Sequence, residues 1–195
     1  MAISRQNGFT LIELMVAIAI MGILFAVALP NFESFVNSNR LSSAANEMIA
    51  SLQTARMESL RRNRRAVVCL SADPGSATPG CTTTNPTGWV TFLDVDKNGS
   101  FTAGVDTLLR ASTLKDRLIV LTSPAVAGKI IFRSDGLARD STDALLNGSV
   151  QFCTTTTRPL QNAREVQVGA GSRVLVKTPA TNVTCATAPN NPTAT

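Results

Sequence analysis

A single carboxylate, Glu13, lies in the apolar run formed by residues 9–29. As a helix this run would be about 32 Å long, and the hydrocarbon core of a bilayer is about 30 Å thick. A charge inside such a span costs roughly 2.5–3.5 kcal/mol on insertion scales and usually marks a functional residue. Residues 10–13, Thr-Leu-Ile-Glu, also match a capping box, in which Glu bonds back to the helix start. Glu13 therefore has two compatible interpretations, a functional charge in the membrane and a helix cap.

The composition excludes several kinds of catalysis. The chain contains no His, which excludes Ser/His/Asp and Cys/His catalysis and every His-ligated metal site. No other catalytic arrangement is visible in the sequence. We therefore expect a protein that is not an enzyme and that needs no cofactor.

One acidic segment resembles part of a calcium loop. Residues 94–99 read Asp-Val-Asp-Lys-Asn-Gly, which is the first half of that loop pattern. The twelfth position should be Glu but is Val105, and Asp106 comes one residue late. Losing the bidentate Glu weakens calcium binding severely. We therefore expect a polar turn between two strands and no metal site.

Two groups of basic residues could contact an anion such as DNA. The first group lies where a helix is expected to end, and cations suit a helix C-terminus, so we favour this helix-end role over an anion-binding patch. The second group is Arg173 and Lys177, which alternation places on one face of an expected strand. They are candidate DNA contacts, with the protective charges of an edge strand as the alternative. The first group consists of Arg61, Arg62, Arg64 and Arg65.

The four cysteines all follow the apolar run, on the side that export would deliver to an oxidising compartment. Four cysteines allow three pairings. We favour Cys69 with Cys81, which closes a short loop, and Cys153 with Cys185, which ties the C-terminal tail to a strand. Each disulfide would stabilise the fold by about 2–4 kcal/mol. A zinc site is the alternative, but no Cys-x-x-Cys spacing is present.

The periodicity predicts an α+β fold, in which one long N-terminal helix packs on a C-terminal antiparallel β-sheet head. Pro30 should kink this helix rather than end it, and the helix should end near residues 62–64. Short apolar segments separated by turn residues then predict strands. The tail, residues 186–195, should be frayed. The helix face expected to pack on the sheet carries Leu41, Ala45, Met48, Leu52 and Ala55, and the expected strands are residues 66–70, 89–93, 107–111, 118–121, 129–133, 149–153, 165–168 and 173–177.

The N-terminal motif resembles a known leader. Residues 8–13, Gly-Phe-Thr-Leu-Ile-Glu, are similar to the class III signal of type IV pilins and pseudopilins. No Ala-x-Ala cleavage site follows the apolar run, as a secretory signal would require. The resemblance implies that prepilin peptidase cuts between Gly8 and Phe9 and methylates the new N-terminal Phe9. It divides the chain into a leader (1–8), a transmembrane and filament-core helix (9–30) and a pilin head (31–195).

The head narrows the resemblance to the FimT/GspH-type minor pilins and pseudopilins. Residues 88–92, Gly-Trp-Val-Thr-Phe, and residues 130–136, Ile-Ile-Phe-Arg-Ser-Asp-Gly, carry this similarity, which extends to about residue 177. Some FimT-type pilins bind DNA through a Gly-Arg-x-Arg motif near the C-terminus. Here Ser172 separates Gly171 from Arg173, and Leu175 stands where the second Arg would be.

The family resemblance implies a role in a filament. The expected partners are other pilins or pseudopilins through the N-terminal helix, prepilin peptidase and the inner membrane, with the head in the periplasm before assembly. In the family, the residue equivalent to Glu13 neutralises the terminal amine of a neighbouring subunit. We expect a minor pilin that acts in assembly near the tip of a type IV pilus, supporting twitching or adhesion. The alternatives are a type II secretion pseudopilin and a DNA-binding pilin for natural transformation.

Overall fold

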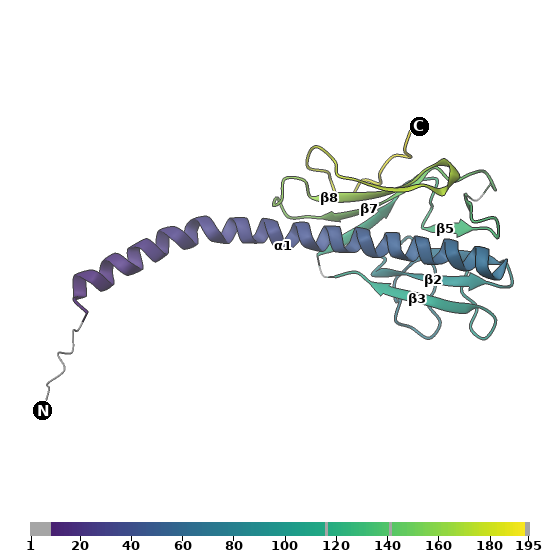
Figure 1. Ribbon diagram of the computed structural model, residues 1–195, viewed down its shortest axis with the longest axis horizontal. Coiled ribbons are helices and arrows are strands. Elements are labelled where there is room, and N and C mark those ends of the chain that lie inside the picture. The colour runs from purple at the N-terminus through teal and green to yellow at the C-terminus, as the bar shows by residue number, and fades with distance from the viewer. Residues whose placement is uncertain (1–8, 116, 141, 194–195) are drawn as a thin grey trace, which may run out of the picture.

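One helix, α1 (Leu11–Arg62), forms both the stalk of the molecule and the spine of its head (Figure 1). The computed structural model describes residues 9–115, 117–140 and 142–193, so the expected leader, with Gly8, lies outside the described residues. The 52 residues of α1 correspond to a length of about 78 Å. The helix continues through Pro30, as expected.

The two ends of α1 are capped by polar residues. At the start, Thr10 Oγ1 accepts a hydrogen bond from the Glu13 N–H at 3.3 Å. At the end, Asn63 adopts a left-handed conformation with φ 51°, which Asn tolerates better than most residues. The Arg64 N–H then donates to the Ser59 carbonyl at 3.2 Å. These contacts confirm the expected end of the helix near residues 62–64.

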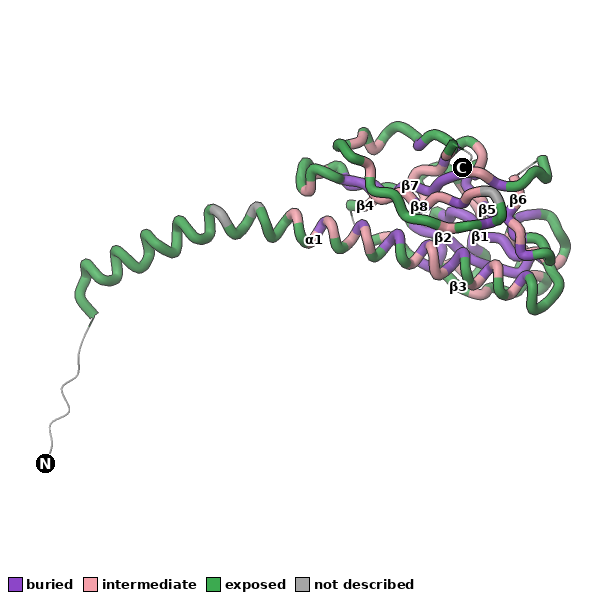
Figure 2. The backbone as a smooth tube through the Cα atoms, turned by 45° about the horizontal axis from the view of Figure 1, so that its top comes forward, coloured by how far each residue is buried: buried purple, intermediate pink, exposed green. Residues whose placement is uncertain are grey.

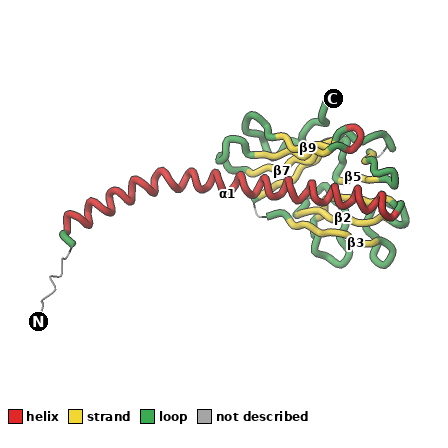
Figure 3. The backbone as a smooth tube through the Cα atoms, viewed as in Figure 1, coloured by secondary structure: helices red, strands yellow, loops and turns green. Residues whose placement is uncertain are grey.

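The head contains two antiparallel sheets, which appear with α1 in Figure 3. All eight strands expected from the sequence form, within one or two residues at each end, and a ninth, two-residue strand β6 joins them. A short 3₁₀ helix, η1 (Ala170–Ser172), precedes the last strand. The first sheet has the order β3 (Thr107–Thr113), β2 (Gly88–Asp94), β1 (Arg65–Ser71), β5 (Lys129–Phe132) and β6 (Ala138–Arg139), and the second has the order β4 (Leu118–Thr122), β7 (Gly148–Thr154), β8 (Ala163–Val168) and β9 (Val174–Lys177).

The second half of α1 packs on both sheets and joins them into one core. Figure 2 shows that burial along the helix begins only where it reaches the head. The five residues of the predicted helix face are all buried. Trp89 on β2 lies against Phe152 on β7, with ring centroids 5.6 Å apart. The indole N–H of Trp89 donates to Ser51 Oγ on α1 at 2.9 Å, so the helix supplies the one polar partner that this buried ring needs.

The first sheet is buried on its other face as well. Val67, Val90 and Phe92 form a second apolar cluster on the side away from α1. The loop after β1 covers this cluster through the Cys69–Cys81 disulfide. The loop after β2 covers it through Phe101, whose ring meets that of Phe92 edge-on at 5.6 Å. Burial on both faces explains why residues 66–70 of β1 are all apolar rather than alternating with polar residues.

The C-terminal tail is ordered through residue 193, so the expectation of a frayed tail was wrong for this part. Cys153 and Cys185 form the second disulfide, and the structure thus brings together both cysteine pairs that the sequence favoured. Beyond it, Asn147 Nδ2 donates to the Pro192 carbonyl at 2.6 Å and Ser149 Oγ donates to the Asn190 carbonyl at 3.2 Å. These hydrogen bonds, together with the burial of Pro189, fix the segment, and composition alone does not reveal either kind of contact.

We predict that Ser51→Ala lowers the free energy of unfolding by about 1–3 kcal/mol, because the buried Trp89 N–H then has no acceptor. Trp89 is the only tryptophan, so its fluorescence reports directly on denaturation of the full chain in detergent. Thr54→Ala is the control, because Thr54 Oγ1 donates only to the Ala50 carbonyl one turn earlier. Equal stability of the two variants would show that the Trp89 bond contributes nothing.

Candidate functional site

The first half of α1 is apolar and exposed (Figure 2). Within the described residues, α1 is the one helix long and apolar enough to cross a membrane. An exposed apolar surface of this extent marks contact with a membrane or with another protein. The exposed large hydrophobic residues here are Phe9, Leu11, Ile12, Leu14, Met15, Val16, Ile18, Ile20, Met21, Ile23, Leu24, Phe25, Leu29, Phe32 and Phe35.

Glu13 lies in the first turn of this exposed half. Only one of the two bonds of a capping box forms, the one from the Glu13 N–H to Thr10. The Glu13 carboxylate itself has no hydrogen bond or ion pair with any other described residue. A carboxylate in apolar surroundings needs a cation or a donor, and the described chain supplies neither. The described chain therefore leaves the Glu13 carboxylate exposed and without a partner of its own.

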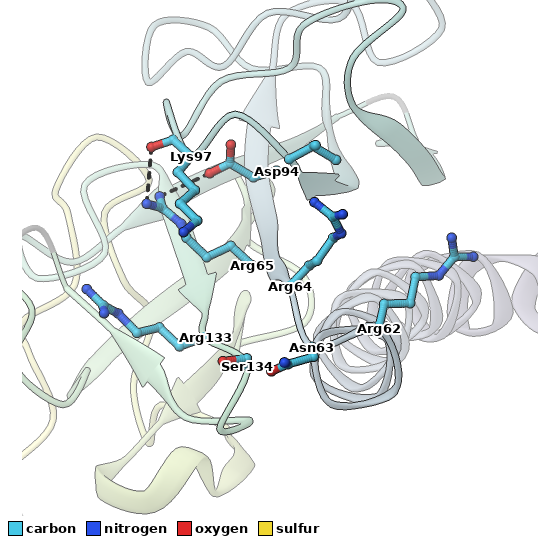
Figure 4. Close-up of a pocket in the computed structure, with 9 residues that line it drawn as sticks. Arg62, Asn63, Arg64, Arg65, Asp94, Lys97, Arg133 and Ser134 are labelled. Carbon is cyan, nitrogen blue, oxygen red and sulfur yellow. Dashed lines mark hydrogen bonds and ion pairs between the residues drawn. The ribbon is translucent and has the colours of Figure 1, made fainter.

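A basic pocket of about 530 Å³ opens at the other end of α1 (Figure 4). Three of the four arginines that the sequence grouped together contribute to it, and Lys97 and Arg133 join them from the turns after β2 and β5. Sequence reasoning missed these two residues because each is far along the chain from the helix end. The lining residues are Arg62, Asn63, Arg64, Arg65, Asp94, Val95, Lys97, Arg133 and Ser134.

Most arginines around this pocket are already paired. Arg65 Nη2 lies 3.0 Å from Asp94 Oδ2, and its Nη1 donates to the Lys97 carbonyl at 3.1 Å; Figure 4 shows both contacts. Arg133 pairs with Asp143. The side chain of Arg64 has no partner among the described residues. The pocket therefore has less free positive charge than its arginine content suggests.

Arg61 and Arg62 both pair with Glu58 in the last turns of α1, at 2.8 and 2.7 Å. Hydrogen bonds from Arg61 and then Arg62 lower the pKa of Glu58, and the same bond raises the pKa of Arg61. Exposed pairs of this kind contribute little to stability. Their geometry fits the helix-end role expected from the sequence, since these cations lie at the negative end of the helix dipole.

The candidate DNA contacts Arg173 and Lys177 lie elsewhere. They line a groove of about 790 Å³ between the second sheet and the C-terminal tail, and this groove shares no lining residue with the basic pocket. Glu165 also lines the groove and stands opposite Lys177 in the β8–β9 register. β9 is an edge strand, as the protective-charge interpretation required. The structure thus keeps the two basic groups apart and places an acid beside the second.

Comparison with known proteins identifies the family. Residues 44–172 match the family described as type II transport protein GspH, and residues 3–29 match the prokaryotic N-terminal methylation motif. The chain belongs to the GspH family. It is 32% identical over 133 residues to fimbrial protein Q of Moraxella bovis, an alignment that covers 67% of this chain and 80% of that protein.

Solved structures share the fold of this GspH family member. The type IV minor pilin FimU of Pseudomonas aeruginosa superposes with a TM-score of 0.50 at 21% identity, over 75% of this chain and 98% of that one. The minor pseudopilin EpsH of the Vibrio cholerae type 2 secretion system does so with a TM-score of 0.50 at 12% identity, over 72% and 98%. The protein is a type IV pilin or pseudopilin, a structural subunit and not an enzyme, and it assembles with other subunits of that kind.

We predict that the mature protein begins at Phe9 and carries a methyl group on its N-terminal amine. The methylation motif spans residues 3–29, and Phe9 directly precedes the helix cap Thr10. Intact-mass analysis of the protein extracted from membranes measures the start site directly. A mature chain that begins at or beyond residue 30 would contradict the prediction, because the exposed apolar half of α1 would then be lost.

Proposed function

We propose that this chain is a minor pilin of a type IV pilus. Prepilin peptidase cuts it between Gly8 and Phe9, and residues 9–30 anchor it in the inner membrane. The head, residues 31–195, faces the periplasm until the subunit enters the pilus near its tip. The observation that carries this proposal is the exposed apolar half of α1 with its unpartnered Glu13.

Physical chemistry connects that observation to assembly. An exposed apolar helix is stable in a bilayer, and it can leave the bilayer only for surroundings of similar polarity, such as the helices of other subunits. A charged Glu13 opposes burial unless a cation meets it there. The N-terminal amine created at Phe9 of a neighbouring subunit is such a cation. Pairing between the two would favour entry of a subunit into the filament and set its axial position.

The pilus is favoured over the secretion system for two reasons. The relative aligned over two thirds of this chain is a fimbrial protein, and two disulfides suit a head exposed outside the cell. A type II secretion pseudopilin is the alternative, since EpsH has the same fold. Deleting the gene distinguishes them: loss of surface pili with normal secretion supports the pilus, and loss of secretion with normal pili supports the pseudopilin.

We predict that Glu13→Ala reduces the amount of this subunit in sheared filaments by about tenfold or more. Removing one partner of a buried pair costs about 3–5 kcal/mol, and each 1.4 kcal/mol is about tenfold. Immunoblots of filaments and of whole cells give the incorporated fraction. The head should remain folded, because the Glu13 carboxylate contacts nothing in it.

Glu33→Ala is the matched control, because Glu33 is exposed on the same half of α1 but lies beyond the membrane segment. It should enter filaments normally. Normal incorporation of both variants into filaments would show that Glu13 has no role in assembly. Reduced incorporation of both would indicate a general effect of charge on the helix.

DNA binding is the second candidate function, and Arg173 and Lys177 are its candidate contacts. We predict that the full chain in detergent binds duplex DNA weakly and without sequence preference. No aromatic residue lines either basic region, so base stacking is absent, and phosphate contacts alone carry no sequence information.

A salt titration of duplex binding tests this prediction. Binding by phosphates weakens with a log–log slope of about −0.9 per neutralised phosphate, so physiological salt should remove most of the signal. Arg64→Gln is the comparison for the pair Arg173→Gln and Lys177→Gln, because the Arg64 side chain lines the other region and has no partner among the described residues. Tight binding that persists at physiological salt and is lost only in the pair would instead support a DNA receptor.

A further inference from the structure

The loop between β2 and β3 gathers three carboxylates. Asp94 ends β2, Asp106 directly precedes β3, and Asp96 lies between them. One oxygen from each residue lies within 4.8 Å of those of the other two. Two loop acids also fix the backbone: Asp106 accepts the Val95 N–H at 2.7 Å and Asp96 accepts the Asn98 N–H at 3.2 Å. The three negative charges are therefore held together by the fold of the loop.

A second observation points to a ligand at this position. Asp94 is 1% exposed, yet its Oδ1 atom has no hydrogen-bond partner. The other oxygen, Oδ2, accepts from the Gly99 N–H at 3.1 Å and pairs with Arg65. Figure 4 shows one oxygen of Asp94 bonded to Arg65 and the other directed away from it. A buried carboxylate oxygen without a partner is costly, and a bound cation would satisfy it.

The charge around the cluster fits a divalent cation. Arg65 is the one cation that pairs with any of the three carboxylates in the described residues, so two negative charges remain. Lys129 Nζ is directed to the Gly99 carbonyl at 3.5 Å rather than to a carboxylate.

The ligand type favours calcium. Calcium accepts carboxylate oxygens in flexible geometry at about 2.3–2.6 Å, whereas magnesium demands near-ideal octahedral geometry at about 2.0–2.1 Å and usually keeps several of its waters. The chain has no His, and all four cysteine sulfurs are paired in disulfides, so no nitrogen or sulfur ligand of the kind zinc prefers is available.

We propose that Asp94, Asp96 and Asp106 bind one Ca²⁺ ion, which fixes the β2–β3 loop on the head. The sequence argued against calcium because Val105 occupies the twelfth position of the loop pattern. The structure offers Asp106 instead, turned inward by its bonds to the Val95 and Thr102 N–H groups. The same loop carries Phe101, which covers the second apolar cluster, so the ion would stabilise the packing of that face.

Calcium titration of the full chain in detergent micelles tests the proposal, which does not depend on the filament role. Calorimetry should show one site with a dissociation constant in the range of extracellular modules, about 10⁻⁴–10⁻³ M, and weaker binding of magnesium. The thermal midpoint read from Trp89 fluorescence should rise with calcium and saturate. Asp96→Asn, an exposed position, should weaken calcium binding by about tenfold or more, because affinity follows the charge of the ligands.

Asp140→Asn is the matched control, because Asp140 also accepts a backbone N–H and a Thr hydroxyl in a turn, from Thr142. It should bind calcium as the unaltered chain does. No saturable heat or midpoint shift up to about 10 mM calcium, or the same affinity in Asp96→Asn, would overturn the proposal. If Asp96→Asn fails to fold, Asp106→Asn replaces it as the variant expected to lose calcium affinity. Calorimetry on the unaltered chain still shows whether a saturable calcium site exists.

Discussion

The packing of the second half of α1 on both sheets is the interaction on which the rest of the structure depends. Leu41, Met48 and Leu52 fill the core that the two sheets share. Polar contacts then fix both ends of this packed segment. Near its start, Asn37 Nδ2 donates to the Arg158 carbonyl at 2.9 Å, and towards its end, Arg56 Nη1 donates to the Ser172 carbonyl at 3.1 Å. The direction of the helix relative to the head is set by these contacts.

This arrangement leaves the first half of the same helix without partners in its own head. Residues 11–29 are apolar apart from Glu13, so water is an unfavourable environment for this half of the helix. One continuous helix thus links a head stabilised by its own core and disulfides to a segment that needs other apolar surfaces. Under the proposed function, the membrane and then the helices of neighbouring subunits would supply those surfaces. The same half of the helix carries Glu13, whose carboxylate has no partner among the described residues.

The sequence predicted the local elements well because their signals are local. The helix face from Leu41 to Ala55 and the eight strands follow from periodicity, and the leader motif follows from six consecutive residues. The features it missed depend on distant residues meeting in space. Lys97 and Arg133 join the helix-end arginines only through the fold, and Asp106 meets Asp94 only because the loop turns inward. The tail was misjudged because it is held by single hydrogen bonds to Asn and Ser side chains and by the burial of Pro189, which composition does not reveal.

The central claim is that the exposed half of α1 is a contact surface for the helices of other subunits. A photo-crosslinking amino acid at Ile12, beside Glu13, tests this most directly in intact sheared filaments, with mass spectrometry of the adducts. The expected result is crosslinking to the apolar N-terminal helices of other pilins or pseudopilins. Filaments that contain the subunit but yield no adduct with any other subunit from this position would contradict the claim.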